Sequence, residues 1–116
     1  MNLGDLHWVE LPGGAGRAQA GRRPAIIVQT DSVSARLPTL LLIPLTTQQD
    51  ALRFPGTVLI EPDTFNLLPR ISIALAFQLT VIDKRFVGPR LGRVSSRTLD
   101  AIWSALDEVT GRSGRT

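Results

Sequence analysis

Two short apolar runs stand out in the pattern of hydrophobic and polar positions: residues 25–28 (Ala-Ile-Ile-Val) and residues 40–43 (Leu-Leu-Leu-Ile). The segment between them, residues 30–38, is polar and rich in turn-forming residues. Short continuous apolar runs bounded by turn signals are typical of buried strands rather than helices. If these two strands pair antiparallel, the start of the first lies beside the end of the second. This pairing predicts that Arg23 and Thr46 meet at one end of a sheet.

Further strands are predicted along the rest of the chain, at residues 5–11, 57–61, 71–77, 78–82 and 90–94. Trp8 is expected to anchor the core from the first of these strands. The segment 63–70 is predicted to be a connection with room for one helical turn. Glycine and proline separate most of the strands, as expected of turns.

The clearest helix is predicted at the C-terminal end. Ser95 is a good N-cap residue, and Gly111 stands where a left-handed C-terminal residue is favoured. Five apolar residues fall at helical spacing on one face: Leu99, Ile102, Trp103, Leu106 and Val109. Residues 112–116 are expected to form a flexible tail.

Several short strands followed by one amphipathic helix predict a mainly β fold. The economical architecture is a small, strongly bent antiparallel sheet or partly open barrel, with the C-terminal helix docked on it. Nothing divides the chain, and at 116 residues it is long enough for one modest core. We therefore predict a single domain over residues 1–111.

Residues 12–21 contain glycines, alanines and a proline but no bulky apolar side chain. Such a segment cannot pack into a core, so a surface loop is predicted. The loop carries Arg17 and Gln19 and leads directly to Arg22-Arg23-Pro24. Loops on rigid sheets often carry binding residues, although a plain surface hairpin would have the same composition.

Composition excludes several classes of site. The chain has no cysteine, which excludes disulfides and thiolate metal sites, and its one histidine, His7, argues against a zinc site or a Ser-His-Asp triad. We predict neither a metal nor a cofactor, and we interpret His7 as a strand residue. No apolar run is long enough to span a membrane, and the N-terminus lacks the pattern of a signal peptide. The expectation is a cytoplasmic protein without membrane contact.

The charge is modestly basic, with a formal net charge of +3. Of the thirteen basic residues, only Lys84 is a lysine, and the other twelve are arginines. Arginine binds phosphate with a bidentate fork and stays charged at physiological pH. A GC-rich genome would give the same bias, so the charge permits a nucleic-acid partner without establishing one.

The order of short motifs resembles the MazF/PemK endoribonuclease toxins of toxin–antitoxin systems. The matching segments are residues 4–11, 21–29, 43–47, 71–74, 78–85 and 91–95, in order and over nearly the whole chain. The resemblance implies an SH3-like barrel with a C-terminal helix. It also implies a homodimer that cleaves single-stranded RNA (mRNA) without metal and is held inactive by a cognate antitoxin protein.

Residue by residue, the resemblance assigns the catalytic arginine to Arg23, just before a proline, and the catalytic threonine to Thr46, at the end of Pro-Leu-Thr. RNA-binding residues are expected at Arg17, Gln19, Arg22, Thr47 and Gln78. In RNA the ribose 2′-OH can attack its own phosphate, so the protein must supply positioning and positive charge. Arg23 suits electrostatic stabilisation, whereas the general base and general acid are unassigned.

The sequence departs from the family pattern at three acidic positions, which are occupied by Ala18, Ile71 and Phe77. These changes leave Arg23 and Thr46 in place. They are expected to affect the ordering of the loop at residues 12–21, the RNA sequence preference and the turnover rate of cleavage.

Other interpretations of the same residues stay open. Arg23 would have a purely structural role if it formed an ion pair with Asp31 or Asp83. In that interpretation the Thr46 hydroxyl stabilises a turn. Gln78 would form hydrogen bonds to a bulged backbone in the sheet. A CcdB-like toxin shares the implied fold but binds a topoisomerase, and it is not expected to keep the Arg-Pro and Pro-Leu-Thr motifs. A non-catalytic RNA-binding relative is the third possibility. For a dimer, the apolar strand residues within 71–79 are the expected interface.

Overall fold

The computed structural model describes residues 1–11 and 21–112. In this part of the chain the strands are β1 (Asp5–Leu11), β2 (Gly21–Ile27), β3 (Thr39–Thr46), β4 (Thr57–Ile60), β5 (Ser72–Leu75), β6 (Thr80–Asp83) and β7 (Val87–Arg93). The α-helices are α1 (Asp31–Ser34) and α2 (Ser96–Thr110), and the 3₁₀ turns are η1 (Gln49–Arg53), η2 (Ala76–Gln78) and η3 (Lys84–Phe86). The predicted mainly β fold with a C-terminal helix is confirmed.

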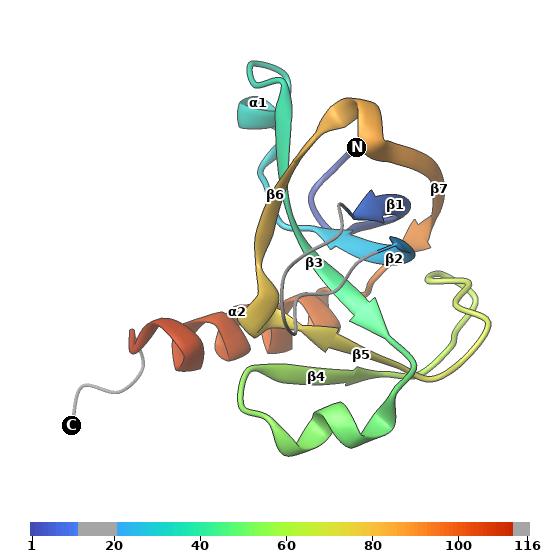
Figure 1. The fold of residues 1–116 in the computed structure, drawn as a ribbon, viewed down its shortest axis with the longest axis vertical. Coiled ribbons are helices and arrows are strands. Elements are labelled where there is room, and N and C mark those ends of the chain that lie inside the picture. Colours follow the sequence, from blue (N-terminus) through green and yellow to red (C-terminus); the bar gives the residue numbers. More distant parts are fainter. Residues whose placement is uncertain (12–20, 113–116) are drawn as a thin grey trace.

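Strand β3 connects the two parts of the sheet. The strand order is β4-β5-β3-β2-β1-β7, with β6 also paired to β3, and all of these pairs are antiparallel. The first half of β3 pairs with β6, its middle pairs with β2, and its last two residues pair with β5. Figure 1 shows β3 as the long strand that runs from the curved half of the sheet toward β4 and β5.

The two apolar runs are continuous because both faces of β2 and β3 are buried. One face, with Ile26 and Ile43, packs in a cluster that includes Ile102 of α2. The opposite face, with Ile27 and Leu42, packs in a second cluster inside the curved half of the sheet. Alternating side chains therefore supply two cores from the same strands.

Trp8 does not anchor the core, contrary to the sequence-based expectation. Its neighbours Leu6 and Val9 are fully buried, whereas Trp8 is only half-buried. Trp8 lies on β1 opposite Pro24 of β2, and its side chain lines a surface pocket instead of the interior.

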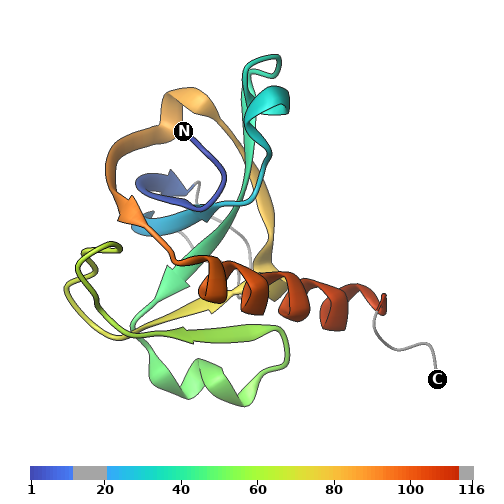
Figure 2. The same cartoon turned by 180° about the vertical axis from the view of Figure 1, so that it is seen from behind.

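Helix α2 has the predicted ends. The Ser95 side chain accepts a hydrogen bond from the Thr98 backbone N–H at 3.1 Å, and Gly111 has a left-handed φ of 81°. Its buried face is centred on Ile102 and Ala105, whereas Trp103 and Val109 of the predicted face are 37% and 43% exposed. Figure 2 shows α2 lying across the back of the sheet. No helix in the described residues is long and apolar enough to cross a membrane.

The connection between β4 and β5 forms hydrogen-bonded turns rather than a helix. Asn66, which is 1% exposed, organises these turns: its side-chain oxygen accepts from the backbone N–H groups of Asp63 (3.0 Å) and Leu68 (2.9 Å), and its amide donates to the Glu61 carbonyl (2.9 Å). A Cβ atom at Gly92 would collide with the carbonyl oxygens of this loop. The close packing fixes the loop against β7.

The polar, turn-rich segment 30–38 contains the single-turn helix α1. The buried Gln29 side chain donates to the Ser34 hydroxyl (3.1 Å) and the Thr39 carbonyl (3.0 Å). These contacts hold the two ends of the connection together.

Candidate active site

The site forms where β3 leaves β2. The last paired residues of these strands are Ala25 and Pro44, and two positions further in the same register are Arg23 and Thr46. At that point, however, β3 pairs with β5, with Thr46 opposite Ile73. Because β3 changes partner, the ends of β2 and β3 separate and a pocket opens between them.

This pocket, called the central pocket below, has a volume of about 250 Å³. It contains both predicted catalytic residues, Arg23 and Thr46, together with the predicted RNA-binding residues Arg22 and Thr47. The full described lining is Trp8, Arg22, Arg23, Pro24, Leu45, Thr46, Thr47, Pro69, Arg70 and Ser72. The structure thus brings four of the seven predicted site residues into one cavity.

Thr46 is held in a defined orientation. Its side chain is 5% exposed, and its hydroxyl oxygen accepts a hydrogen bond from the Gln48 backbone N–H at 3.1 Å. A hydroxyl has one hydrogen to donate in addition to its two acceptor lone pairs. With one lone pair occupied by Gln48, the hydroxyl keeps its hydrogen for a group bound in the pocket.

The central pocket is positively charged. Arg22, Arg23 and Arg70 line it from β2 and from the β4–β5 loop, and its described lining contains no carboxylate. The Arg22 guanidinium also lies 5.0 Å from the centroid of the Trp8 ring, within the range of a cation–π contact. Such a cavity favours an anionic ligand, and arginine forks suit the oxygens of a phosphate.

Gln78 lies in a neighbouring pocket of about 280 Å³, called the Gln78 pocket below. Thr46 lines both this pocket and the central pocket. Phe54 and Phe77 also line the Gln78 pocket, and the centroids of their rings lie 5.7 Å apart. Gln78 is therefore connected to the central pocket through Thr46. The other two predicted RNA-binding residues, Arg17 and Gln19, lie outside the described residues.

Sequence reasoning missed Trp8, Arg70 and Ser72 as lining residues. Arg70 comes from the connection between β4 and β5, and Ser72 begins the strand that pairs with the end of β3. The sequence signal was their position at the start of the predicted strand 71–77: Arg70 precedes the strand, and Ser72 is its second residue. Using that signal required the β3–β5 pairing, which no local pattern gives.

Both acidic residues considered as partners of Arg23, Asp31 and Asp83, have other contacts. Asp31 accepts a hydrogen bond from the Leu3 backbone N–H at 2.8 Å, and Asp83 lies 3.8 Å from Arg85. His7 is a buried strand residue, as predicted, with its Nδ1 3.0 Å from the Gly88 carbonyl. Among residues 1–11 and 21–112, no group of three or more His, Asp or Glu side chains is arranged to hold a metal ion.

Comparison with known proteins decides the family. The model of the PemK-like, MazF-like toxins of type II toxin–antitoxin systems matches residues 2–110. The chain belongs to this family. Among curated relatives, the endoribonuclease MazF of Staphylococcus saprophyticus is 27% identical over 111 residues, which cover 96% of this chain and 92% of the relative. The endoribonuclease MazF6 of Mycobacterium tuberculosis is 27% identical over 110 residues, covering 94% and 96% of the two chains.

Solved structures of family members share the fold. A crystal structure of MazF from Deinococcus radiodurans has a TM-score of 0.80 at 23% identity, covering 96% of each chain. A mycobacterial endoribonuclease in complex with its cognate antitoxin has a TM-score of 0.77 at 22% identity, covering 96% of this chain and 95% of that one. At this level of identity the structures support the fold, and the function rests on the family and on the site.

Proposed function

We propose that this protein is the toxin of a type II toxin–antitoxin system and that it cleaves single-stranded RNA without a metal ion. The observation that carries the proposal is the shared central pocket of Arg23 and Thr46, at the point where β3 changes partner. The curated relatives named as endoribonucleases support the same activity.

In the proposed reaction the ribose 2′-oxygen attacks the adjacent phosphorus atom. The 2′-OH gives up its proton to a base that is not assigned, and the new bond joins the 2′-oxygen to phosphorus. The bond from phosphorus to the 5′-oxygen breaks, and the leaving oxygen takes up a proton. The products are a 2′,3′-cyclic phosphate and a free 5′-OH. Negative charge builds up on the phosphate oxygens on the way, and Arg23 is proposed to stabilise it, because its side chain lines the same pocket as Thr46.

Thr46 is proposed to add a hydrogen bond to a phosphate oxygen. The bond from the Gln48 N–H fixes its hydroxyl oxygen, so the hydroxyl hydrogen is available without a large loss of rotational freedom. Arg22 and Arg70 are proposed to bind the phosphates of the RNA backbone, and Thr47 and Gln78 to contact the strand on either side of Thr46.

A cognate antitoxin is the proposed inhibitor, by similarity to the mycobacterial complex. An acidic segment would compete with RNA for the arginines of the central pocket, and its binding would weaken with added salt. A homodimer is proposed to extend the groove across two copies. Within the expected interface segment, residues 73–76 belong to the core, so Ile71, Phe77 and Leu79 are the exposed apolar side chains that remain for it.

The proposed activity is tested with purified protein and a long single-stranded RNA in the presence of EDTA. We expect specific cleavage, fragments with 2′,3′-cyclic phosphate and 5′-OH ends, and no cleavage at a site whose scissile nucleotide carries a 2′-deoxy sugar. Cleavage of the deoxy-substituted site would mean that water or a side chain attacks. An absence of cleavage together with binding to a topoisomerase would support the CcdB-like alternative instead.

A further inference from the structure

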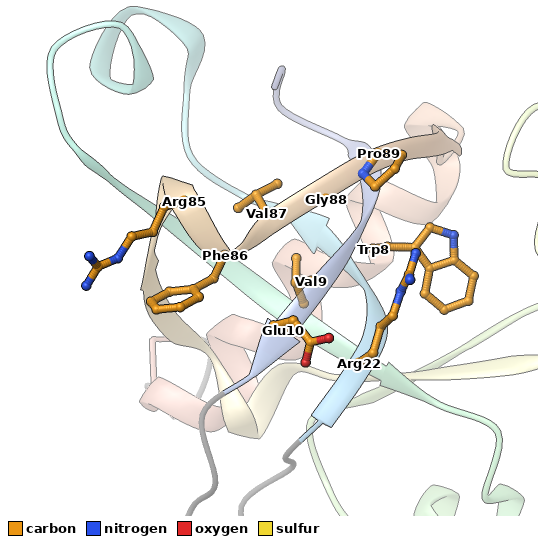
Figure 3. Close-up of a pocket in the computed structure, with 9 residues that line it drawn as sticks. All are labelled: Trp8, Val9, Glu10, Arg22, Arg85, Phe86, Val87, Gly88 and Pro89. Atoms are coloured by element: carbon orange, nitrogen blue, oxygen red, sulfur yellow. The ribbon is translucent and has the colours of Figure 1, made fainter.

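A third pocket lies beside the central pocket, between β1 and β7, with a volume of about 210 Å³. It is called the Trp8–Phe86 pocket below and is bounded by Trp8, Glu10, Arg22, Phe86, Gly88 and Pro89. Figure 3 shows Phe86 on one side and Trp8 with Arg22 on the other, with Glu10 between them. Trp8 and Arg22 also line the central pocket, so the two cavities share a wall.

The pocket opens because β1 and β7 lose their regular pairing at Trp8. His7 pairs with Arg90 and Val9 pairs with Val87, so two residues of β7, Gly88 and Pro89, stand opposite the single residue Trp8. This is the geometry of a β-bulge, a feature that is frequent beside active sites. A Cβ atom at Gly88 would lie 3.0 Å from the Trp8 carbonyl oxygen, so a residue without a side chain suits this close approach.

The chemistry of the pocket suits a flat aromatic ligand. Two aromatic side chains, Trp8 and Phe86, line the pocket. Phe86 is 43% exposed and contributes little to the core. The volume is below the about 300–1,000 Å³ of pockets for drug-sized ligands, which points to a single ring system. Unpaired RNA bases are commonly bound by stacking on aromatic side chains and on arginine planes.

Glu10 narrows the class of ligand. Its exposed carboxylate lies in the pocket, whose lining also includes Arg22 and Arg85, and it offers hydrogen-bond acceptors to a base held between the two aromatic side chains. A carboxylate accepts hydrogen bonds and donates none, which matches the amino groups of cytosine, adenine or guanine. Uracil has no amino group; its N3–H donor lies between two carbonyl oxygens, which repel a carboxylate, so uracil pairs less well with Glu10.

We propose that the Trp8–Phe86 pocket binds one unpaired base of the RNA, next to the nucleotide whose phosphate occupies the central pocket, and that Glu10 selects a base with an amino group. This inference rests on the proposed function. Arg22, on the shared wall, contacts the backbone between the two positions. The pocket therefore contributes to sequence preference close to the cleaved bond.

Fluorescence of Trp8 tests the proposal directly. The chain has two tryptophans, so a Trp103→Phe background leaves Trp8 as the single reporter, and Trp103 lies on the exposed part of α2. The probes are short 2′-O-methyl oligonucleotides of adenosine, cytidine or uridine, which cannot undergo 2′-OH attack. We expect adenosine and cytidine probes to quench Trp8 and to bind about fivefold or more tightly than the uridine probe.

Two variants with matched controls separate the contributions. Phe86→Ala is expected to weaken binding of every probe by about 5- to 150-fold, the range for stacking one base on an aromatic side chain. The control is Phe65→Ala, because Phe65 is 59% exposed and does not line this pocket. Glu10→Gln is expected to bring the affinities for the three probes together, whereas Glu61→Gln, on an exposed carboxylate outside the pocket, leaves them unchanged.

Each outcome decides the proposal. The base-pocket proposal would be overturned if Phe86→Ala and Phe65→Ala bound the probes equally well, or if Trp8 fluorescence did not change on binding. In that case, RNA cleavage by the unmodified chain would still support the proposed function. Quenching and base preference without any cleavage would support the pocket and count against the nuclease. Binding of an acidic peptide to Trp8, with no effect of the oligonucleotides, would also overturn it.

Discussion

Replacement of Asn66 by alanine tests how the β4–β5 loop is held, and with it the placement of Arg70 in the central pocket. The side chain is buried and makes three hydrogen bonds, to the backbone of Glu61, Asp63 and Leu68. Asn66→Ala removes all three and leaves the Leu68 N–H group buried without this partner. The change removes little apolar contact, so the hydrogen bonds dominate the expected effect.

The magnitude follows from the number of bonds and from their burial. A typical hydrogen bond contributes about 1 kcal/mol net, and a buried group left unsatisfied costs about 1–3 kcal/mol. We therefore expect Asn66→Ala to lower the free energy of unfolding by about 3 kcal/mol. For a domain of about this size a loss of 1 kcal/mol lowers Tm by about 4–8 °C, so a decrease of roughly 12–24 °C is expected.

The assay is urea and thermal unfolding followed by circular dichroism. The matched control is Asn2→Ala at the exposed N-terminal end, for which a change within about 0.5 kcal/mol is expected. If Asn66→Ala lost less than about 1 kcal/mol, the loop would not depend on this side chain, and the account of how Arg70 is positioned would be wrong.

Two further predictions concern single residues. Leu67 has a left-handed φ of 55°, which costs a residue with a Cβ about 1–2 kcal/mol. Leu67→Gly should therefore raise the free energy of unfolding in urea by up to about 1 kcal/mol, despite the greater freedom of glycine in the unfolded chain. A clear loss of stability would contradict this prediction. Thr46→Val keeps the shape of the side chain but not the hydroxyl, and it is expected to lower kcat for RNA cleavage by about 100-fold. Thr46→Ser should retain most activity, and equal activity of the valine and serine variants would exclude the hydroxyl from the reaction.

The sequence predicted the meeting of Arg23 and Thr46 because one register of two adjacent antiparallel strands determines it. The apolar runs within β2 and β3 were recognisable without any knowledge of the rest of the fold. Antiparallel pairing up to Ala25 and Pro44 then directs Arg23 and Thr46 to the same pocket, although the strand ends separate beyond that pair. The same kind of local signal located Ser95 and Gly111 at the ends of α2.

The parts that sequence reasoning missed depend on contacts between distant segments. Trp8 looked like a core residue because large aromatic side chains are usually buried, but the change of partner by β3 leaves its ring at a pocket. Trp103 fits the apolar face of α2 by spacing, yet Ala105 is the residue turned toward the sheet. The role of Arg70 in the lining required the path of the β4–β5 loop, which the Asn66 hydrogen bonds determine.

The central claim is that Arg23 stabilises the charge that develops on the phosphate during RNA cleavage. The most direct measurement is the rate of cleavage of one RNA in EDTA by Arg23→Ala, compared with Arg36→Ala, which removes an exposed arginine outside the three pockets. With both proteins shown to be folded, we expect Arg23→Ala to lower the rate by about 1,000-fold or more and Arg36→Ala to leave it nearly unchanged. Normal cleavage by folded Arg23→Ala would contradict the account.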